Sequence, residues 1–384
     1  MRDVQRPLVW LHAPSVGEGL QARPVAHALR TAHPEVQLAY TFYSPSAARF
    51  ADSVGADITD YLPFDGAREC DAMLDALKPT ALVFVKLDVW PVLVARAAAR
   101  GIPVALLSAT LAPGSGRLGA FSKMLLHDAY AALRSVGAID AQHGARLQLL
   151  GVRESVIRVT GDTRFDQVWS RAEAVDRTSP LLTLLRSKRP TLVAGSTWPA
   201  DDAVLGDAWI AVRRAIPGAR LIVAPHEPTD VHVQSLEAWA KTHRLRVVRL
   251  SVLQERAGSG DGDADVIVLD QVGLLGDVYA LADAAFVGGG FHAAGLHSVI
   301  EPAAFGVPVA FGPRHTMSRE AGLLLAAGGG ATARTSRALA EVLTQWLGDQ
   351  QKREREGQRA REVVRAELGA TARSVALVEE LLAR

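Results

Sequence analysis

The sequence is almost free of cysteine, with Cys70 the only one among 384 residues. A single cysteine cannot form an intrachain disulfide, and it excludes the cysteine clusters that hold structural zinc. The eleven histidines include no HExxH pair, and no DxD-type acidic pair lies where a metal bound to a nucleotide is expected. We therefore expect chemistry without a metal or another cofactor. The lack of disulfides favours a reducing compartment.

The sequence also lacks an excess of charge of either sign, with 42 Lys and Arg against 41 Asp and Glu. This balance gives no electrostatic reason to expect nucleic acid as a partner. The first apolar run, Leu8 to Leu11, is far shorter than the roughly 20 residues of a membrane span. Charged, Gly or Pro residues interrupt every later run. We expect a protein that does not span a membrane, although attachment to a membrane surface stays open.

Two motifs of common enzyme classes are missing. The sequence has no GxSxG nucleophile elbow and no GxxxxGK[ST] phosphate loop. Their absence disfavours an α/β-hydrolase and a P-loop NTPase.

The length and the hydrophobic pattern predict two α/β domains. A chain of 384 residues exceeds the usual size of one hydrophobic core. Short β-rich runs alternate with amphipathic segments of helical length, which is typical of βαβ units and parallel sheets. The predicted strands are 8–12, 36–42, 81–85, 104–108, 135–139 and 156–160 in the first half, and 191–195, 221–224, 246–250, 266–269, 285–287 and 309–311 in the second.

The second series of strands starts after a helix-like stretch that ends in RSKRP at 186–190. The tail is rich in Arg and Glu at helical spacing, which is typical of a solvated helix face, and a membrane or partner patch is the alternative. Segment 257–264, AGSGDGDA, is predicted to be a surface loop. We predict four parts: an N-terminal Rossmann-like domain over 1–167, a linker over 168–190, a C-terminal Rossmann-like domain over 191–348, and a helical tail over 349–384.

The first candidate site is HAPSVGEG, which directly follows the first strand at 12–19. In open α/β sheets, ligands bind beyond the carboxyl ends of strands. Ser15 and Glu18 have the spacing of a helix capping box, which gives Glu18 a structural role. Alternatively, Glu18 points into a cleft between the domains as a general base, kept ionised by the helix N-terminus. The pattern leaves both interpretations open.

The second candidate site is the glycine-rich turn FVGGG at 286–290, after which a helix is expected to begin near 295–298. Glycines let backbone N–H groups approach a phosphate closely, and a helix N-terminus adds positive potential. Glu301 is placed to accept hydrogen bonds from ribose hydroxyls. Pro302 requires a very short preceding turn or a break in the helix. The alternative is a tight packing turn between strand and helix.

Four further loops carry polar residues directly after predicted strands. Ser196 or Thr197 could cap the next helix and bind a phosphate, and His226 in PHEP could contact a donor. Asp88 in KLDVWP and Arg164 in GDTRFD are candidate contacts to a donor or an acceptor. A plain surface turn is the alternative for each loop.

Taken in order, these segments resemble the Kdo (3-deoxy-D-manno-octulosonic acid) transferases over nearly the whole chain. The resemblance implies the GT-B fold, in which two Rossmann-like domains face each other across a cleft. It also implies an inverting, metal-independent transfer of Kdo from CMP-Kdo to a lipid A precursor in lipopolysaccharide biosynthesis. The matching segments are SVGE at 15–18, LDVWP at 87–91, GDTRFD at 161–166, AGST at 194–197, APHEP at 224–228, and FVGG…EPAAFGVPVAFGP at 286–313.

The resemblance assigns Glu18 as the base that deprotonates the acceptor hydroxyl. The implied donor pocket consists of Ser196, Thr197, His226, Gly288, Gly289, Gly290, His297, Ser298 and Glu301. The implied contacts to acceptor or donor are Ser15, Gly17, Asp88, Arg164 and Arg314, with Arg314 or Arg164 as candidates for the carboxylate of Kdo.

The sequence departs from the family pattern in three places. The family's apolar N-terminal anchoring helix is not found, so we expect peripheral attachment to the cytoplasmic face of the inner membrane. Leu296-His297-Ser298 replaces Gly-His-Asn, and 291–296 lacks the usual arginine. Lys86 stands where an acidic residue is common.

Two alternative functions stay open: a GT-B enzyme that uses a UDP-sugar, such as an epimerase or a hexosamine transferase, and a non-catalytic sugar-nucleotide sensor.

Overall fold

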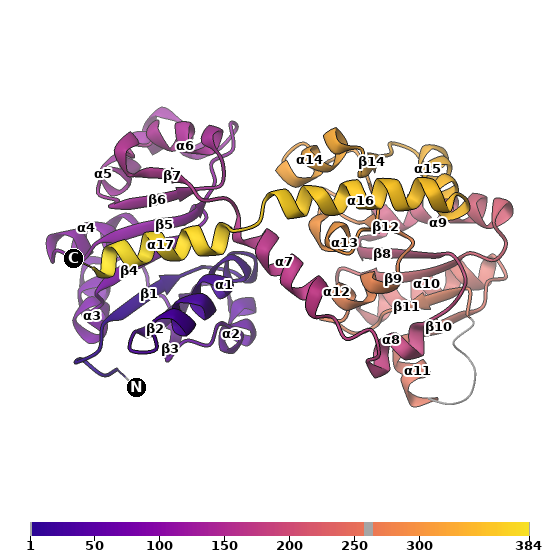
Figure 1. Cartoon of the computed structure of the whole chain (residues 1–384), viewed down its shortest axis with the longest axis horizontal. Helices are drawn as coiled ribbons and strands as arrows, with labels where there is room; N and C mark the ends of the chain where they lie inside the picture. The colour runs from indigo at the N-terminus through magenta and orange to yellow at the C-terminus, as the bar shows by residue number, and fades with distance from the viewer. Residues whose placement is uncertain (1, 257–263, 384) are drawn as a thin grey trace. The chain divides into compact units, whose positions relative to one another are not determined.

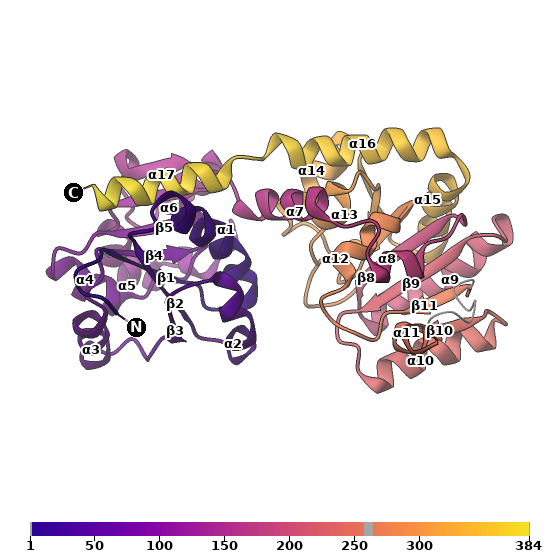
Figure 2. The same ribbon diagram turned by 60° about the horizontal axis from the view of Figure 1, so that its bottom comes forward.

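The computed structural model describes residues 2–256 and 264–383, which form two compact units (Figures 1 and 2). The N-terminal unit runs to Gln167 and resumes at Glu367, and the C-terminal unit spans Val168–Ala366. Of the surface loop predicted at 257–264, all but Ala264 lies outside the described residues.

The described part of the N-terminal unit contains a seven-stranded parallel sheet in the order β3-β2-β1-β4-β5-β6-β7. Its strands are β1 (Leu8–His12), β2 (Gln37–Phe42), β3 (Ile58–Tyr61), β4 (Ala81–Val85), β5 (Val104–Ala109), β6 (Ser135–Ala138) and β7 (Ile157–Val159). Its helices are α1 (Val16–Ala32), α2 (Pro45–Ala51), α3 (Ala67–Leu77), α4 (Pro91–Ala99), α5 (Ala120–Ala131), α6 (Ala141–Gln148) and α17 (Ala370–Leu382), and α7 (Thr163–Ala174) begins there.

Helices cover both faces of this sheet, which explains its continuous apolar strands. Successive side chains of a strand point to opposite faces. Leu8 and Trp10 of β1 therefore lie in one core, and Val9 and Leu11 lie in the other. Helix α17 contributes to the second core and packs beside α1.

The C-terminal unit repeats the arrangement, with a parallel sheet in the order β10-β11-β9-β8-β12-β13-β14 in its described part. Its strands are β8 (Thr191–Thr197), β9 (Arg220–Pro225), β10 (Val247–Arg249), β11 (Val266–Val268), β12 (Ala284–Val287), β13 (Val309–Phe311) and β14 (Gly330–Thr332). Its helices are α8 (Pro180–Leu185), α9 (Pro199–Ala215), α10 (Asp230–Thr242), α11 (Leu250–Glu255), α12 (Leu275–Val278), α13 (Ile300–Ala304), α14 (Arg319–Ala327), α15 (Ser336–Gly348) and α16 (Gln350–Ala366).

The twelve predicted strands all have counterparts, and β1, β4 and β13 have the predicted bounds. The sequence analysis missed the edge strands β3 and β14. Three of the four residues of β3 are exposed, and β14 consists of Gly, Ala and Thr. Neither strand carries the apolar run that marks a strand covered on both faces.

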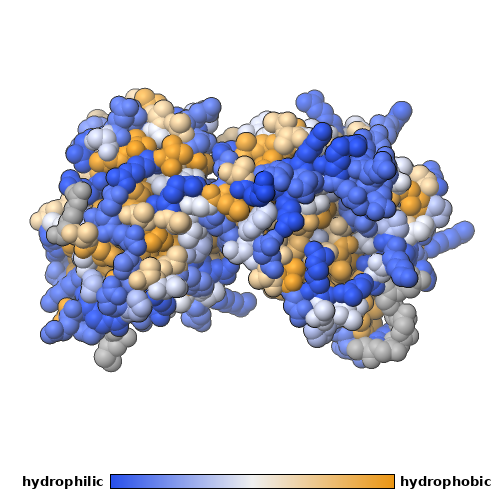
Figure 3. Space-filling view, viewed as in Figure 1, coloured by the Kyte–Doolittle hydropathy of each residue, from blue (hydrophilic) through white to orange (hydrophobic). Residues whose placement is uncertain are grey.

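Beyond residue 167 the units differ from the predicted boundaries. Residues 168–190 belong to the C-terminal unit, where Leu182 and Leu185 of α8 are fully buried, so this segment is packed structure as well as a connection. The predicted tail also divides, because α16 packs on α13, α14 and α15, whereas α17 belongs to the N-terminal unit. Helix α16 buries Gly357, Ala360 and Val364 and covers its outer side with hydrophilic residues (Figure 3).

Each sheet has a point at its centre where the strand order reverses. In the N-terminal unit β1 pairs with β2 on one side and β4 on the other, and in the C-terminal unit β8 pairs with β9 and β12. Ligands of open α/β sheets bind at such points, beyond the carboxyl ends of the strands. We therefore expect a site at the loops after β1 and β4, and at those after β8 and β12.

Within residues 2–256 and 264–383, no helix is long and apolar enough to cross a membrane.

Candidate functional site

Glu18 lies in the first turn of α1, just beyond the carboxyl end of β1, and its side chain is 14% exposed. Ser15 is the N-cap residue, but its side chain accepts no N–H of the helix. Its hydroxyl donates instead to Oε2 of Glu18. The capping box predicted as one interpretation of Glu18 is therefore not formed, and the carboxylate is held by a hydroxyl.

A lysine binds the second oxygen of the same carboxylate. Lys86 follows β4 directly, and its Nζ donates to Glu18 Oε1 over 2.7 Å. Burial raises the pKa of Glu18, but the hydrogen bonds from Lys86 and Ser15 outweigh it and hold the pKa below the ordinary value of a glutamate. Glu18 is therefore ionised at neutral pH, as a proton acceptor must be.

Asp88 takes part in a polar network behind Lys86. Its Oδ2 accepts a hydrogen bond from Trp90 Nε1 over 2.8 Å and lies 3.6 Å from Nε2 of the buried His12. Arg117 lies 3.7 Å from Oδ1. Burial raises the pKa of Asp88, but His12 and Trp90 outweigh it and lower the pKa. The carboxylate is 32% exposed, so it orders the loop after β4 and still faces solvent.

Two other residues of this unit, Arg164 and Gly17, were predicted to contact the donor or the acceptor, and they differ in how free they are to do so. Arg164 donates from Nε and Nη2 to Oδ2 of Asp162, over 2.9 and 2.6 Å. Burial raises the pKa of Asp162, but Arg164 and Gln21 outweigh it and lower the pKa, so Arg164 has a structural partner. Gly17 is exposed, and a Cβ there would meet only Ser15 Oγ, at 3.7 Å.

In the C-terminal unit the glycine-rich turn after β12 is explained first by packing. A Cβ on Gly288 would lie 2.2 Å from the Ser196 carbonyl oxygen, and one on Gly290 would lie 2.4 Å from the Gly312 nitrogen. Gly289 has φ +89°, and a Cβ there would lie 2.0 Å from the Gly295 carbonyl oxygen. Tight packing of the turn, which was the alternative interpretation, is therefore enough to explain why all three residues are glycine.

Asp201 organises this turn, and the sequence analysis did not identify it. Its side chain is completely buried in the first turn of α9. Oδ2 accepts hydrogen bonds from the backbone N–H of Trp198 at 3.0 Å and of Gly289 at 2.7 Å, and Oδ1 accepts one from Phe291 at 3.0 Å. The N–H groups of Gly289 and Phe291 therefore bind a protein carboxylate instead of a phosphate. The only sequence signal was an aspartate at N3 of a predicted helix.

Four aromatic rings, Trp198, His226, His292 and His297, form a cluster that we call the ring cluster. Trp198 stacks on His292 with ring centroids 4.3 Å apart, and His226 stacks on His297 at the same distance. Trp198 Nε1 donates to His297 Nε2 over 2.9 Å. Burial and the neighbouring His226 and His292 lower the pKa of His297 to about 4. His297 is therefore neutral at pH 7, with its proton on Nδ1.

Glu301 and Pro302 lie in α13, which begins only at Ile300. Pro302 is thus in the first turn, as its position required, but the helix starts later than predicted and has five residues. Burial raises the pKa of Glu301 in spite of the nearby Arg171 and a hydrogen bond from Ser298. Because α13 is so short, it supplies little of the dipole expected at this turn.

Ser196 and Thr197 belong to β8 and do not cap α9, whose N-cap residue is Trp198. Ser196 has φ +54°. Thr197 Oγ1 is buried and has no hydrogen-bond partner among the described residues. Arg314 is exposed at the far side of the glycine-rich turn, where its N–H donates to the Gly290 carbonyl. Ser196 and Arg314 are accessible to a ligand, whereas the side chain of Thr197 is completely buried.

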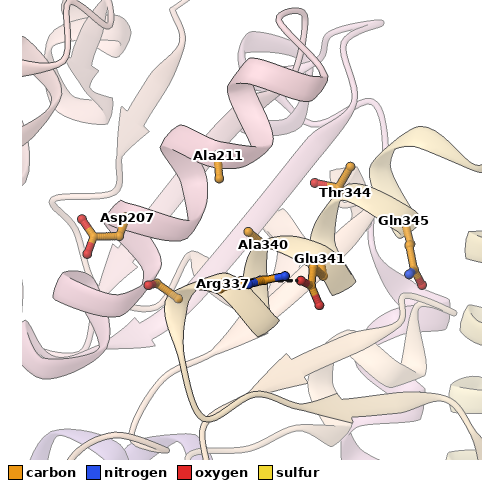
Figure 4. A pocket seen from close by; sticks show the side chains of 8 residues that line it. Asp207, Ala211, Arg337, Ala340, Glu341, Thr344 and Gln345 are labelled. Atoms are coloured by element: carbon orange, nitrogen blue, oxygen red, sulfur yellow. Dashed lines mark hydrogen bonds and ion pairs between the residues drawn. The ribbon is translucent and has the colours of Figure 1, made fainter.

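Two hollows in the C-terminal unit lie away from the glycine-rich turn. A groove of about 590 Å³ between α9 and α15 is lined by Asp207, Ala211 and the Arg337–Glu341 ion pair (Figure 4). A cavity of about 590 Å³ between α9 and α10 shares Trp198 with the ring cluster. Among residues 2–256 and 264–383, no three His, Cys, Asp or Glu side chains are grouped as a metal site requires.

The sequence was compared with those of known proteins. Residues 2–167 match the family described as 3-deoxy-D-manno-octulosonic-acid transferase (kdotransferase). A 3-deoxy-D-manno-octulosonic acid transferase of Bordetella pertussis is 31% identical over 386 residues, covering 97% of this chain and 87% of the relative. The enzyme of the same name from Haemophilus influenzae is 27% identical over 384 residues, covering 98% and 87%.

Solved structures show the same fold at low sequence identity. UDP-GlcNAc 2-epimerase from Neisseria meningitidis, bound to UDP-GlcNAc, has a TM-score of 0.67 and 12% identity, covering 98% of this chain and 99% of that one. HepE from Anabaena, in complex with UDP, has a TM-score of 0.61 and 13% identity, covering 98% and 100%. The two Rossmann-like halves are those of the GT-B fold.

Proposed function

The chain belongs to the 3-deoxy-D-manno-octulosonic acid transferase family, and from this premise we propose that it transfers Kdo from CMP-Kdo to a lipid A precursor. The enzyme is a glycosyltransferase of lipopolysaccharide biosynthesis. In the proposed reaction the configuration at the anomeric carbon is inverted, no metal takes part, and Glu18 is the general base.

The observation that carries the proposal is the ionised Glu18 at the reversal point of the N-terminal sheet. Its carboxylate accepts the proton of the acceptor hydroxyl while the hydroxyl oxygen forms a bond to the anomeric carbon of Kdo. The bond from that carbon to the CMP phosphate breaks, and CMP leaves with the electron pair. A single displacement from the face opposite CMP gives inversion.

We assign the donor nucleotide to the C-terminal unit. The ring cluster offers aromatic faces for stacking, and the neutral His297 offers an Nδ1–H donor. Ser196 and the exposed Arg314 supply polar contacts beside the glycine-rich turn, whereas Thr197 is completely buried and makes no direct contact with the donor. Gly288, Gly289 and Gly290 shape the turn, and Ser298 and Glu301 are assigned to the ribose.

We further propose that the enzyme binds the cytoplasmic face of the inner membrane through α5. The outer side of this helix carries Phe121, Met124 and Leu125, which are 70%, 67% and 59% exposed. Their i, i+3, i+4 spacing places them on one side of the helix, where they form an apolar stripe. The stripe precedes β6 and follows β5, within the unit assigned to the lipid acceptor.

The test uses the purified protein with CMP-Kdo and a lipid A precursor, with the product followed by mass spectrometry. Transfer of one or more Kdo residues is the expected result. Thermal unfolding with CMP and with UDP separates the donor classes, because a ligand at 100 times its Kd adds about 2.7 kcal/mol of stability. Stabilisation by UDP alone, without transfer from CMP-Kdo, would favour a UDP-sugar enzyme and reject the proposal.

A further inference from the structure

Lys86 has a backbone conformation that lysine rarely adopts. Its φ is +69°, in the left-handed region. The surrounding backbone holds it there, because the Lys86 N–H donates to the Leu107 carbonyl over 2.8 Å and the Lys86 carbonyl accepts from the Thr110 N–H over 3.1 Å. Residues held in such conformations concentrate at functional sites.

The side chain of Lys86 is a partly exposed cation that binds a carboxylate oxygen of Glu18, the proposed base. Its Nζ lies 2.7 Å from Glu18 Oε1, and the side chain is 46% exposed. Of the two side chains that bind the Glu18 carboxylate, Ser15 and Lys86, Lys86 is the cation. A four-carbon stem lets the ammonium group exchange one anionic partner for another nearby.

The chemistry of the donor brings a second anion to this position. For proton transfer, the acceptor hydroxyl must lie within about 2.6–3.2 Å of Glu18. The attacked anomeric carbon must then lie about 3–3.5 Å from the hydroxyl oxygen. In Kdo this carbon carries the carboxylate directly. Every productive complex therefore brings a carboxylate within reach of the Lys86 ammonium.

We propose that Lys86 moves from Glu18 to the carboxylate of Kdo when the donor binds. This inference rests on the proposed function. The exchange has two effects, since it neutralises an anion that would otherwise repel the base and it frees Glu18 from the ammonium that weakens its basicity. The base therefore becomes stronger when the electrophile arrives. Lys86 itself exchanges no proton and forms no covalent bond.

Lys86 suits this role better than the cations of the same unit that lie in neighbouring loops. Arg164 binds the buried Asp162, whose carboxylate would lose its cationic partner if Arg164 moved. Arg117 lies 3.7 Å from the carboxylate of Asp88. Lys86 contacts the proposed base directly, over 2.7 Å.

The test compares two donors, CMP-Kdo and CMP-Kdo with its carboxylate converted to the carboxamide. Wild type, Lys86→Met and Lys86→Arg receive the same lipid A precursor, and kcat/KM is measured for each donor. We expect wild type to prefer the carboxylate by about 10- to 100-fold, the range of a hydrogen bond to a charged group. Lys86→Met should lose this preference and Lys86→Arg should keep most of it, while the Kd of CMP, which has no Kdo carboxylate, should stay the same in all three.

Lys78→Met is the matched control, because Lys78 also has a left-handed backbone (φ +43°) and lies just before β4, at the opposite end of the strand. It should behave as wild type. A full donor preference in folded Lys86→Met, checked by thermal unfolding, would overturn the inference and leave the proposed function intact. Absence of Kdo transfer by wild type would overturn both. Equal losses on the two donors would show that Lys86 acts on Glu18 or the acceptor alone and would also overturn the inference.

Discussion

The ammonium group of Lys86 lies 2.7 Å from the carboxylate of Glu18, although 67 residues separate them in the sequence. The contact exists because β1 and β4 are neighbours in the sheet, so the loops that follow them meet at its carboxyl edge. It determines the protonation of the proposed base in the free enzyme. Its consequences for catalysis are measurable through pH.

Lys86→Met should shift the acidic limb of the pH–rate profile to higher pH. Activity requires ionised Glu18, so kcat/KM rises as pH rises through the pKa of Glu18. In wild type, Lys86 and Ser15 hold this pKa below its ordinary value. Without Lys86, burial raises the pKa of Glu18 with only Ser15 and a backbone hydrogen bond opposing it, while Tyr40, whose pKa burial raises well above its usual value, stays neutral.

The measurement is kcat/KM against pH, with Lys78→Met as control. Removal of a charge-assisted hydrogen bond should move the limb by about one pH unit or more. A limb that stays in place, or moves to lower pH, would show that Lys86 does not control the ionisation of Glu18.

Asp201→Asn should weaken both the fold and the binding of the nucleotide. The substitution replaces one carboxylate oxygen with an amide nitrogen, which cannot accept a hydrogen bond, so at least one N–H group of this turn loses its acceptor. We expect a loss of about 1–3 kcal/mol in the free energy of unfolding, and a further loss of affinity for CMP as the ring cluster shifts. Denaturant unfolding and calorimetric titration with CMP measure the two effects.

Asp207→Asn is the control for this variant, because Asp207 is an exposed residue of the same helix, α9. It should change neither quantity. If Asp201→Asn bound CMP with wild-type affinity, Asp201 would have no part in shaping the donor site.

Gly289→Ala should strongly destabilise the C-terminal unit. The added Cβ would lie 2.0 Å from the Gly295 carbonyl oxygen, at a φ of +89° that alanine disfavours. We expect a loss of about 2–4 kcal/mol from strain and overpacking together. Gly322→Ala, in α14 with open space around its Cβ position, should instead stabilise the protein by about 0.5–1 kcal/mol. Equal unfolding free energies for the two variants would contradict the packing role of the turn.

The double variant Phe121→Ser/Met124→Ser should bind lipid vesicles more weakly. Burial of a large apolar side chain contributes about 1.5–3 kcal/mol, so removing two should lower the partition coefficient at least about tenfold. Sedimentation with vesicles of phosphatidylethanolamine and phosphatidylglycerol measures it. Val231→Ser, which removes a side chain that is 79% exposed on α10 of the other unit, should bind as wild type. Unchanged binding of the double variant would exclude α5 as the docking helix.

Hydrophobic pattern was sufficient to predict the fold, because strands covered on both faces carry apolar runs. Leu8–His12 and Ala81–Val85 are such runs, and both strands were found at the predicted residues. Ile58–Tyr61 is mostly exposed, so it has no comparable run and was missed. The ends of predicted helices were less certain, as α13 shows, because loop geometry decides where a helix begins.

Candidate site residues were predictable where they follow strands, and their partners were not. Glu18 and the glycine-rich turn follow β1 and β12, so a pattern along the sequence points to them. Asp201 and Lys86 act on residues far away in the sequence, through contacts that depend on which strands become neighbours. The capping box considered for Glu18 is not formed for the same reason, since Lys86 and Ser15 each donate a hydrogen bond to the Glu18 carboxylate. Contacts between residues far apart in the sequence, such as that of Lys86 with Glu18, depend on the order of the strands in the sheet.

The central claim is that Glu18 accepts the proton of the acceptor hydroxyl during Kdo transfer. The most direct measurement is the turnover of Glu18→Gln with CMP-Kdo and a lipid A precursor, beside wild type and Glu35→Gln, an exposed glutamate of the same unit. We predict a kcat lower by about 10²- to 10⁴-fold for Glu18→Gln, with CMP affinity unchanged and Glu35→Gln fully active. Near-normal turnover by Glu18→Gln would contradict the account.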